Sequence, residues 1–392
     1  MSILTPRDFD DLQQIMTMIV ADKTPVEIRA GGTKTGLGAP VATDHCLDIS
    51  ALSGVIEYEP EELIITAHAA TPLADIESLV AENGQMLAFE PPHLDRLYQQ
   101  DNTGTIGGTL MANLSGPRRL SVGAARDFLL GFQGISGRGA SFRSGSKVVK
   151  NVTGYDLSKL LCGSFGTLAV LDEITLKTLP APQTSVSVVI ACKTLDEAAS
   201  AARAAMQTAY EPSSAAILPK GIDELSRNAP IALIRLEGVD ISVRDRVTQL
   251  TNSLSSYGHA DCLDHQTSTA IWAAIRDVAP LLSDDGHIWR ISLAPSEGPD
   301  LYHAIVNDLP ATGYFDWAGG LLWLHCDDDT AHETIRAHLT ACSGGHATLM
   351  RAPDQLRQNV PVFEPLDPLL ASLSSRIQES FDPHRLLNPG RL

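Results

Sequence analysis

Two glycine-rich stretches are the first places where this chain could bind a ligand through its backbone. The first, "IRAGGTKTGLG", covers residues 28–38, and the second, "DNTGTIGGTLMANLSGPRR", covers residues 101–119. Successive N–H groups in loops without Cβ atoms can form a concave anion site that suits a pyrophosphate. The alternative is that both stretches are only tight turns.

The spacing of these glycines excludes two common phosphate motifs. Neither stretch has the G-x-G-x-x-G of a dinucleotide-binding loop, and G-x-x-x-x-G-K-[ST] does not occur in the chain. A third segment, "KNVTGYDLSKLLCGSFGTLAV" at 150–170, carries further glycines. The three segments together favour a ligand-binding backbone over isolated turns.

The charge of the chain limits its partners. The 392 residues have a formal net charge of −18, which argues against nucleic acid as a principal partner. The stretch 118–159 is nevertheless basic, with eight Lys and Arg against two Asp. This stretch would either bind an anionic ligand or acidic neighbour, or form a solvated hairpin.

The termini, apolar runs and cysteines predict a cytoplasmic protein without a metal. No run reaches the ~20 apolar residues that cross a bilayer, and the first residues lack the pattern of a secretion signal. The six cysteines include no CxxC pair and no zinc or iron–sulfur spacing, so we expect reduced, mostly buried thiols.

The order of the predicted elements gives the fold class, α+β. Apolar spacing predicts a helix over 8–21, and a second helix capped by Thr71 and closed by Gly84. A hairpin is expected to turn at 137–139. After Pro180 and Pro182 the order becomes strand, helix, strand, strand, helix, and a similar alternation returns later. This order indicates an antiparallel, ferredoxin-like sheet with helices on one face.

Six motifs in this sequence resemble the FAD-binding proteins of the PCMH, or vanillyl-alcohol oxidase, type. They are "RAGGTKTGLG", "TPLADIESLVAENGQMLAFEPP", "TIGGTLMANLSGPRR", "GAARDFLLGFQ", "KNVTGYDLSKLLCGSFGTLAV" and "FDPHRLLNPGRL". Within that family, the chain is most similar to the FAD-binding subunits of bacterial glycolate oxidases. The resemblance implies a two-part FAD-binding domain over 1–180, an α+β cap or substrate domain over 181–355, and a C-terminal helix and tail over 356–392 that returns to the FAD domain.

The resemblance also assigns cofactor-binding residues. The first loop would bind the pyrophosphate through Arg29, Ala30, Gly31, Gly32, Thr33, Lys34 and Thr35. The second would line the other side of the cofactor through Thr105, Ile106, Gly107, Gly108, Ala112 and Asn113. The adenosine or flavin would contact Gly154, Gly163, Gly166, Thr167 and Val170, and the C-terminal tail would return through Asn388. Some members tether FAD through a histidine near the first loop; residues 28–38 contain none, so we expect non-covalent FAD.

Catalytic residues are harder to assign. Oxidation of a 2-hydroxy acid needs a base for the hydroxyl proton and a cation for the carboxylate. The H-x-G-D-G-N-x-H motif of catalytic relatives does not occur in this chain. The remaining candidates are Arg290, His325 and Tyr155. Arg290 would pair with either a substrate carboxylate or a structural Asp or Glu. Tyr155 would pack near the cofactor, more as a core residue than as an acid or base.

Three functions remain open from the sequence. The first is the FAD-binding subunit of a complex that oxidises glycolate or D-2-hydroxy acids, working with a second flavoprotein and an iron–sulfur subunit. The second is an independent FAD-dependent oxidoreductase. The third is a non-catalytic assembly or electron-transfer subunit with a vestigial substrate site. For the first, the location is cytoplasmic, with peripheral attachment to the inner membrane through the complex left open.

Overall fold

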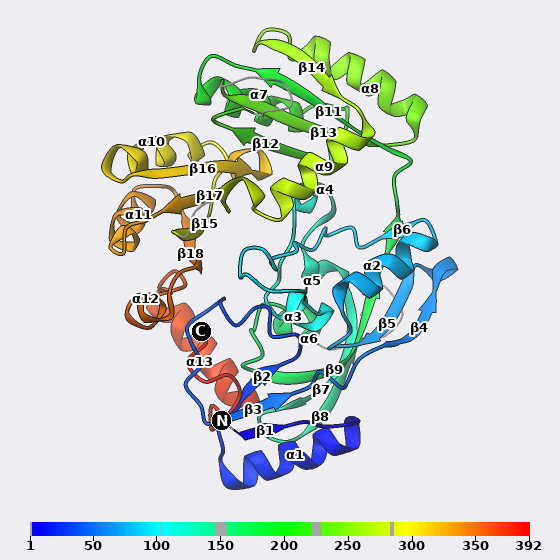
Figure 1. Cartoon of the computed structure of the whole chain (residues 1–392), viewed down its shortest axis with the longest axis vertical. Coiled ribbons are helices and arrows are strands. Elements are labelled where there is room, and N and C mark those ends of the chain that lie inside the picture. Colours follow the sequence, from blue (N-terminus) through cyan, green and yellow to red (C-terminus); the bar gives the residue numbers. More distant parts are fainter. Residues whose placement is uncertain (1, 103, 146–154, 222–228, 283–285) are drawn as a thin grey trace. The chain divides into compact units, whose positions relative to one another are not determined.

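The computed structural model describes residues 2–102, 104–145, 155–221, 229–282 and 286–392 (Figure 1). They form two compact units. Unit 1 comprises residues 1–115, 124–181 and 365–392, and unit 2 comprises residues 116–123 and 182–364. The sequence prediction places residues 116–123 in the FAD-binding domain and residues 356–364 in the C-terminal segment that returns to it. In the structure both segments belong to unit 2.

Unit 1 contains three sheets among its described residues. A parallel sheet has the order β1-β3-β2. An antiparallel sheet has the order β4-β5-β9-β7-β8, and β6 pairs with β10. The strands are β1 (Ser2–Leu4), β2 (Glu27–Arg29), β3 (His45–Asp48), β4 (Val55–Glu59), β5 (Ile64–His68), β6 (Gln85–Met86), β7 (Leu129–Ser136), β8 (Ser141–Gly145), β9 (Ala169–Lys177) and β10 (Leu179–Pro180).

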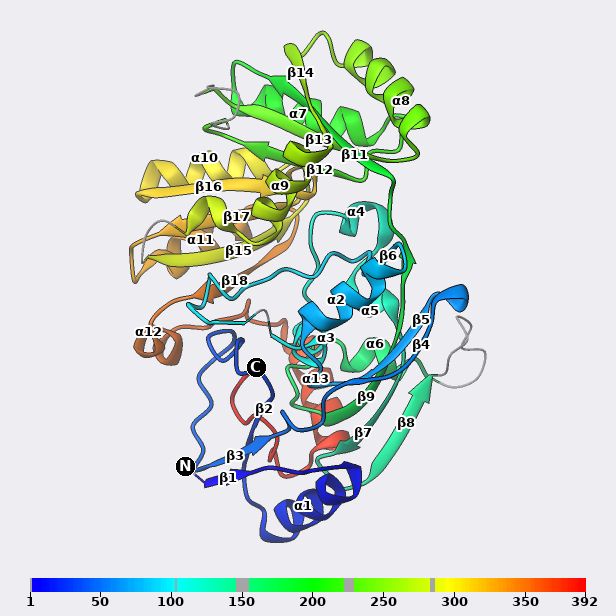
Figure 2. The same ribbon diagram turned by 45° about the vertical axis from the view of Figure 1, so that its right-hand side comes forward.

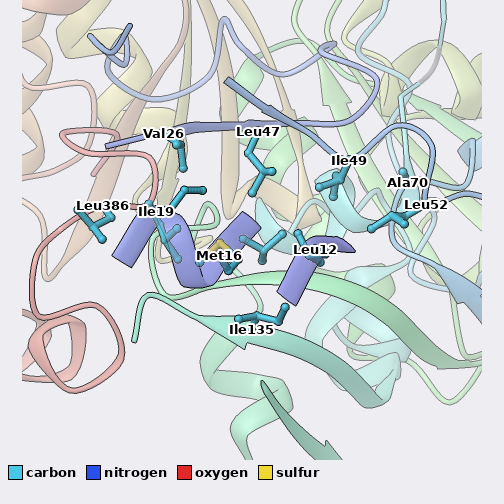
Figure 3. Packing of buried hydrophobic residues seen from close by; sticks show 12 residues of the cluster. Leu12, Met16, Ile19, Val26, Leu47, Ile49, Leu52, Ala70, Ile135 and Leu386 are labelled. Atoms are coloured by element: carbon cyan, nitrogen blue, oxygen red, sulfur yellow. The ribbon is translucent and has the colours of Figure 1, made fainter. Parts of the chain in front are cut away.

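The core of unit 1 fixes the end of β2, where the first glycine loop begins. Leu12, Met16 and Ile19 lie on one face of the first helix and pack with Leu47 of β3 and Ile135 of β7 (Figure 3). Each such buried side chain contributes roughly 1.5–3 kcal/mol. The helices of this unit are α1 (Phe9–Asp22), α2 (Leu73–Glu82), α3 (Ile106–Met111), α5 (Ala125–Phe128), α6 (Leu157–Leu161) and α13 (Pro368–Phe381).

The C-terminal tail belongs to the same core. Leu386 and Leu387 are buried in the cluster, and Leu387 forms a parallel bridge with Val26, just before β2. The tail therefore supports the strand that leads into the first glycine loop, although about 360 residues separate the two segments.

Unit 2 is built on one antiparallel sheet with the order β14-β11-β13-β12-β16-β17-β15-β18 (Figure 2). Its first four strands in the chain and its last four repeat one topology, and β12 joins β16 through the pair Ile217 and Phe315. The strands are β11 (Thr184–Ala191), β12 (Ser214–Leu218), β13 (Ile231–Gly238), β14 (His259–Leu263), β15 (His287–Leu293), β16 (Ala311–Asp316), β17 (Leu321–Cys326) and β18 (Gly345–Arg351). Each half is therefore a ferredoxin-like arrangement, joined edge to edge.

Trp289 and Phe315 of this sheet pack against helices α10 and α11, whereas Arg290 faces the opposite side of the sheet. Trp289 of β15 lies 5.6 Å from the guanidinium of Arg336 in α11, and Phe315 of β16 packs edge-on against Tyr302 of α10. Because neighbouring residues of a strand face opposite sides, Arg290 faces away from α10 and α11. The helices of unit 2 are α4 (Arg119–Val122), α7 (Leu195–Met206), α8 (Asp240–Ser253), α9 (His265–Arg276), α10 (Gly298–Asp308), α11 (Ala331–Thr340) and α12 (Asp354–Asn359).

The α+β class and the antiparallel sheet are confirmed, and several local predictions can be scored. The first helix has Asp8 as its N-cap, as the acidic start indicates, and the hairpin turns between β7 and β8. The cap predicted for α2 is wrong, because Pro72 occupies the N-cap position and the Thr71 hydroxyl donates to the carbonyl oxygens of Gly54 and His68. Sequence analysis missed β14, α9, α10 and β16.

Candidate cofactor-binding site

The first glycine loop has backbone donors for which no described residue is an acceptor. Gly32 and Gly38 have φ values of 70° and 82°, a left-handed backbone that glycine adopts without strain. Within the described part of the chain, the N–H groups of residues 31–34 donate no hydrogen bond. Because unpaired backbone N–H groups are uncommon in folded proteins, four in succession indicate a site for an anionic ligand.

The second glycine loop has a different structural role. At the start of α3, Ile106 donates its N–H to the Thr71 carbonyl oxygen and Gly107 donates to Ala69. Gly108 donates to the hydroxyl of Thr105, the N-cap. These donors are therefore occupied, so α3 does not provide the anion site. Its glycines instead allow close packing, since a methyl group at Gly107 would lie 2.6 Å from the Ala69 carbonyl oxygen.

The C-terminal tail holds two other segments in place through one side chain. Asn388 accepts a hydrogen bond from the Ile28 N–H at 2.7 Å and donates to the Phe165 carbonyl oxygen at 2.7 Å. Gly166, beside Phe165, has a φ of 71°, and a methyl group there would lie 2.8 Å from the Asn388 amide nitrogen. The hydrogen bond between Asn388 of the tail and the loop at 163–167 therefore requires glycine at position 166.

Arg391 fixes the shape of the first glycine loop, and sequence analysis missed it. Its guanidinium donates to the carbonyl oxygens of Thr35 and Leu37 at 3.1 and 3.0 Å. It also pairs with Glu27 at 2.9 Å, with both side chains nearly buried. These contacts tie the last residues of the chain to both ends of the loop. An arginine directly after an "NPG" motif gives no recognisable signal in the sequence, because its partners lie more than 350 positions away.

These segments enclose a cavity of about 130 Å³ in unit 1. The walls combine polar loop residues with apolar residues from β2, β9 and α3, a composition typical of cofactor sites. The lining residues are Ile28, Arg29, Ala30, Gly31, Gly32, Thr33, Lys34, Thr35, Leu37, Ile49, Ala69, Thr105, Gly107, Gly108, Met111, Ala112, Phe165, Gly166, Ala169, Val170, Leu171, Asn388 and Arg391.

Most residues assigned to the cofactor from the sequence meet at this cavity, and a few do not. The whole segment 29–35 and Thr105, Gly107, Gly108, Ala112, Gly166, Val170 and Asn388 line it. Four assigned residues do not line it: Ile106, Asn113, Gly163 and Thr167. Ile106 and Thr167 are buried in the protein, and Gly163 lies against the side chain of Asn113. The remaining assigned residue, Gly154, lies outside the described residues.

Two cations at the cavity differ in how they are paired. Arg29 donates to Glu27 through Nε at 2.9 Å, so it has an ion-pair partner within the protein, which it shares with Arg391. The Lys34 ammonium makes no hydrogen bond or ion pair with the residues that the structure describes, although the Lys34 carbonyl oxygen accepts a hydrogen bond from the Leu37 N–H. Burial of the Lys34 ammonium lowers its pKa to about 8, while the side chain keeps partial exposure to the cavity. Lys34 is therefore a cation available to an anionic ligand.

The basic stretch at 118–159 does not supply the anion site. None of its described arginines and lysines lines the cavity. Arg138 donates to the carbonyl oxygens of Ser380 and Glu379, and Arg118 pairs with Glu237 at 2.8 Å. These two arginines are therefore used in contacts within the protein, and Lys147 and Lys150 lie outside the described residues.

The cavity fits the cofactor that the sequence predicts. Unpaired N–H groups in loop 31–34 and the ammonium of Lys34 can bind the two phosphates of FAD. Ile28, Met111, Phe165 and Val170 give apolar surface for its aromatic parts. No histidine or cysteine is among the described lining residues, which agrees with the predicted non-covalent binding without testing it.

The catalytic candidates lie elsewhere, and one of them is wrong as predicted. Tyr155 is 90% exposed, so it is not a core residue. His325 lies on β17 with its Nε2 buried and without a hydrogen-bond partner in the described structure. A Cβ at Gly286 would overlap this ring, so the histidine packs directly against the backbone there. Arg290 has no structural carboxylate partner among the described residues, contrary to one of the two alternatives above.

The two units and the cavity define the class of this protein: an FAD-binding flavoprotein with an α+β second domain. A family model described as "FAD binding domain" matches residues 2–145. Over its full length the chain resembles p-cresol methylhydroxylase, with a TM-score of 0.73 and 14% identity over 99% of this chain and 88% of that one. This likeness concerns the fold alone.

The sequence comparison with curated proteins is more specific. The chain is 36% identical to the glycolate oxidase subunit GlcE of Escherichia coli (strain K12), over 98% of both chains. It is 28% identical to the glycolate oxidase subunit GlcD of Bacillus subtilis (strain 168), over 58% of this chain and 45% of that protein. The chain belongs to the PCMH-type family of FAD-linked oxidoreductases, and FAD is its cofactor.

Two further observations limit what else the chain contains. No described helix is long and apolar enough to cross a membrane. Within the described ranges, no group of three or more His, Cys, Asp or Glu side chains could hold a metal ion. The six cysteines are free thiols, and four of them are buried.

Proposed function

We propose that this chain is the FAD-binding subunit of a glycolate oxidase or dehydrogenase complex that oxidises glycolate, or a D-2-hydroxy acid, to the 2-oxo acid. The observation that carries this proposal is the match to GlcE, at 36% identity over 98% of both chains. Such coverage includes both units and the C-terminal tail. Relatives named D-lactate dehydrogenase and D-2-hydroxyglutarate dehydrogenase match about half of this chain and support the same substrate class.

The residues of the cavity would bind and orient the cofactor. Bound FAD would accept the two electrons released when a 2-hydroxy acid loses its C–H and O–H hydrogens. The N–H groups of residues 31–34 would hold the pyrophosphate, with the Lys34 ammonium adding a charge-assisted contact. Asn388 and Arg391 would keep the loop in its binding shape before the cofactor arrives, which lowers the entropic cost of binding.

The proposed partners are a second flavoprotein subunit and an iron–sulfur subunit. GlcD, which this chain also matches, is likewise named a glycolate oxidase subunit, which supports a second, related subunit as the flavoprotein partner. The proposal includes an iron–sulfur subunit to carry the electrons onward; because the thiols of this chain are free and unclustered, any such cluster would be held by another subunit. The complex would work in the cytoplasm and would contact the inner membrane only through its partners.

One observation favours a second candidate, a non-catalytic assembly or electron-transfer subunit. The histidine motif of catalytic relatives does not occur anywhere in the sequence. In this alternative the chain would bind FAD and a partner, while a second flavoprotein would oxidise the substrate. The stand-alone oxidoreductase is the remaining possibility, and it requires turnover by the isolated chain.

Anaerobic absorption spectra separate these functions. The purified chain with FAD is mixed with glycolate, first alone and then together with its GlcD-like and iron–sulfur partners. Bleaching of the flavin bands by glycolate in the isolated chain would show a self-sufficient substrate site. Bleaching only in the assembled complex, with loss of that bleaching when this chain's cofactor loop is altered, would support the proposed subunit. A chain that binds no FAD at all would contradict the proposal.

A further inference from the structure

Unit 2 contains a cluster of cations around one tryptophan, and the cofactor cavity does not account for it. The guanidinium of Arg119 lies 4.5 Å from the centre of the Trp317 ring, and that of Arg290 lies 5.0 Å from it. Arg119 begins α4, Arg290 is in the middle of β15, and Trp317 follows β16. Three distant parts of the sequence therefore bring two positive charges to one aromatic ring.

Arg290 is the member of this cluster that lacks a partner. Within the part of the chain that the structure describes, its guanidinium makes no hydrogen bond or ion pair, and the Trp317 ring is its contact. Burial, followed by the charge of Arg119, lowers the pKa of Arg290 to about 10, and Asp316 only partly opposes this. Arg290 is thus charged at neutral pH, partly buried and without an ion-pair partner among the described residues, so an anionic ligand could pair with it.

Trp317 is held rigidly in an unusual conformation. Its φ is 53° and that of Ala318 is 55°, both in the left-handed region that non-glycine residues seldom adopt. The Trp317 N–H donates to Asp316 Oδ1 at 2.7 Å, and its indole N–H donates to the Gly116 carbonyl oxygen at 3.2 Å. Backbone strain that the surrounding contacts maintain is a common feature of binding sites. The ring is therefore a fixed support for both guanidiniums.

Polar groups continue along the same face of the sheet. Ser292 lies two residues after Arg290 in β15 and so faces the same side, and His346 of β18 pairs with Ser292 in the register. Together with residues 343–345 they line a shallow hollow. Loss of solvent around His346, and then the charges of Arg290 and Arg119, lower its pKa, so at neutral pH the imidazole is neutral and can donate or accept a hydrogen bond.

We propose that Arg290 and Arg119, supported by Trp317, bind the carboxylate of a small 2-hydroxy or 2-oxo acid, with Ser292 and His346 contacting its oxygen at C2. The identity of the acid rests on the proposed function. A guanidinium matches a carboxylate through two parallel N–H···O bonds. Asp316 and Glu364 reduce the positive potential around the cluster, which favours a monoanion over a dianion such as phosphate.

The test compares ligand binding by variants of the full-length chain loaded with FAD. Glycolate, D-lactate and inorganic phosphate are titrated separately, and binding is followed by calorimetry and by tryptophan fluorescence. The variants are Arg290→Met, Arg290→Lys and Arg119→Met. Arg244→Met is the matched control, because this arginine of α8 is exposed and, among the described residues, its side chain pairs with Asp240 one turn away. FAD content and melting temperature are measured for every variant.

The expected results follow from the unpaired state of Arg290. Arg290→Met and Arg119→Met should each weaken binding of glycolate or D-lactate by roughly 10- to 100-fold, the loss expected for a hydrogen-bonded charge. Arg290→Lys should recover part of the lost affinity, since lysine keeps the positive charge but lacks the two parallel N–H donors of a guanidinium. Arg244→Met should bind like the unmodified chain. Replacing Trp317 by Phe should remove the fluorescence response, and phosphate should bind more weakly than either acid.

Failure of this inference differs from failure of the proposed function. If the unmodified chain binds glycolate or D-lactate and both methionine variants bind equally well, the carboxylate site is elsewhere and the proposed function stands. If the unmodified chain binds phosphate but neither acid, the cluster is a site for another anion and the inference is wrong. If it binds no 2-hydroxy acid as an isolated chain or in its complex, the proposed function fails as well.

Discussion

Two arginines in the sheet of unit 2 each lie against a tryptophan ring, but they differ in whether the protein gives them an ion-pair partner. Arg235 of β13 lies 4.7 Å from the Trp272 ring, and Arg290 of β15 lies 5.0 Å from the Trp317 ring. Arg235 is 2% exposed, donates to the Ser214 hydroxyl at 2.6 Å and pairs with Glu237 at 3.6 Å, although its buried Nε donates no hydrogen bond within the described structure. Arg290 has no such partner in the described residues.

The difference separates charges that stabilise the fold from charges that are available to a ligand. A buried ion that has an ion-pair partner can be tolerated, and removing one partner leaves the other less compensated. A charge that the protein leaves unpaired has the opposite property, because its removal relieves a cost. The same distinction separates the N–H groups of α3, which donate within the protein, from those of residues 31–34, for which no described residue is an acceptor. It also separates Arg29, which pairs with Glu27, from Lys34, whose ammonium has no described partner. It can be tested at each of these places.

The largest effect is expected where the paired arginine is removed. Arg235→Met should lower the free energy of unfolding by about 3–5 kcal/mol, because Glu237 would remain buried with less compensation. Arg290→Met should leave it unchanged or raise it slightly. Thermal unfolding of the two full-length variants, followed by circular dichroism, measures both changes in stability. Equal losses of stability for the two variants would show that Arg290 is a structural residue after all.

A smaller effect concerns the pH dependence of the paired cluster. Burial alone would raise the pKa of Glu237, but the charge of Arg235 and the contacts from Arg118 outweigh it and lower the pKa to about 2. A carboxylate with a depressed folded-state pKa contributes stability above its unfolded pKa of about 4.3, and this contribution is lost as the pH falls towards 2. It should be on the order of 3 kcal/mol.

The measurement compares the unmodified chain with Glu237→Gln between about pH 3 and pH 7. The unmodified chain should be clearly more stable at neutral pH, and the difference should shrink as the solution becomes acidic. A difference that stays constant over this range would mean that Glu237 stabilises through packing and not through its charge.

How far the sequence predicted these features depends on the range of the interactions. The glycine loops, the family and most cofactor residues follow from short motifs, because consecutive residues form the loops. The missed elements are those whose local signal is weak: β14 is an edge strand with exposed His259 and Cys262, and α10 begins with Gly298 and Pro299, which suggest a turn. The sequence could not reveal that Arg119 meets Arg290, since that proximity depends on strand register and on residues 116–123 joining unit 2.

Two neighbouring glycines in α3, which both line the cofactor cavity, differ in the same way: Gly107 packs closely against the backbone of another segment, whereas Gly108 does not. A methyl group at Gly107 would overlap the backbone of Ala69, whereas one at Gly108 would meet only Thr105 Oγ1 at 3.4 Å and the end of Lys34. Gly107→Ala should therefore cost roughly 1–3 kcal/mol of stability. Gly108→Ala should keep or slightly raise it, since alanine favours helix, and should instead weaken FAD binding.

Melting temperature without FAD and the dissociation constant for FAD distinguish the two variants. A loss of stability in Gly108→Ala as large as in Gly107→Ala would mean that both glycines serve helix packing, and that α3 does not border the cofactor.

The smallest effect is expected at Lys34, the unpaired cation of unit 1. Its pKa of about 8 should rise when the pyrophosphate of FAD binds nearby, so binding should take up a proton. FAD affinity should then be highest below about pH 8 and fall as the pH rises above it, by about tenfold per pH unit at most. The stability of the chain without FAD should change in the opposite direction, because the unfolded state binds this proton more tightly up to about pH 10.

Calorimetry at about pH 8.5 in two buffers of different ionisation enthalpy measures the proton uptake directly. Lys34→Met should abolish the uptake and make FAD affinity independent of pH in this range, while Lys34→Arg should keep the affinity and lose the pH dependence. The comparison of binding with stability matters here, because a lysine away from the phosphates would still change the stability with pH but would leave FAD affinity unchanged. If FAD binding by the unmodified chain takes up no proton, Lys34 lies away from the phosphates and the N–H groups of residues 31–34 bind them alone.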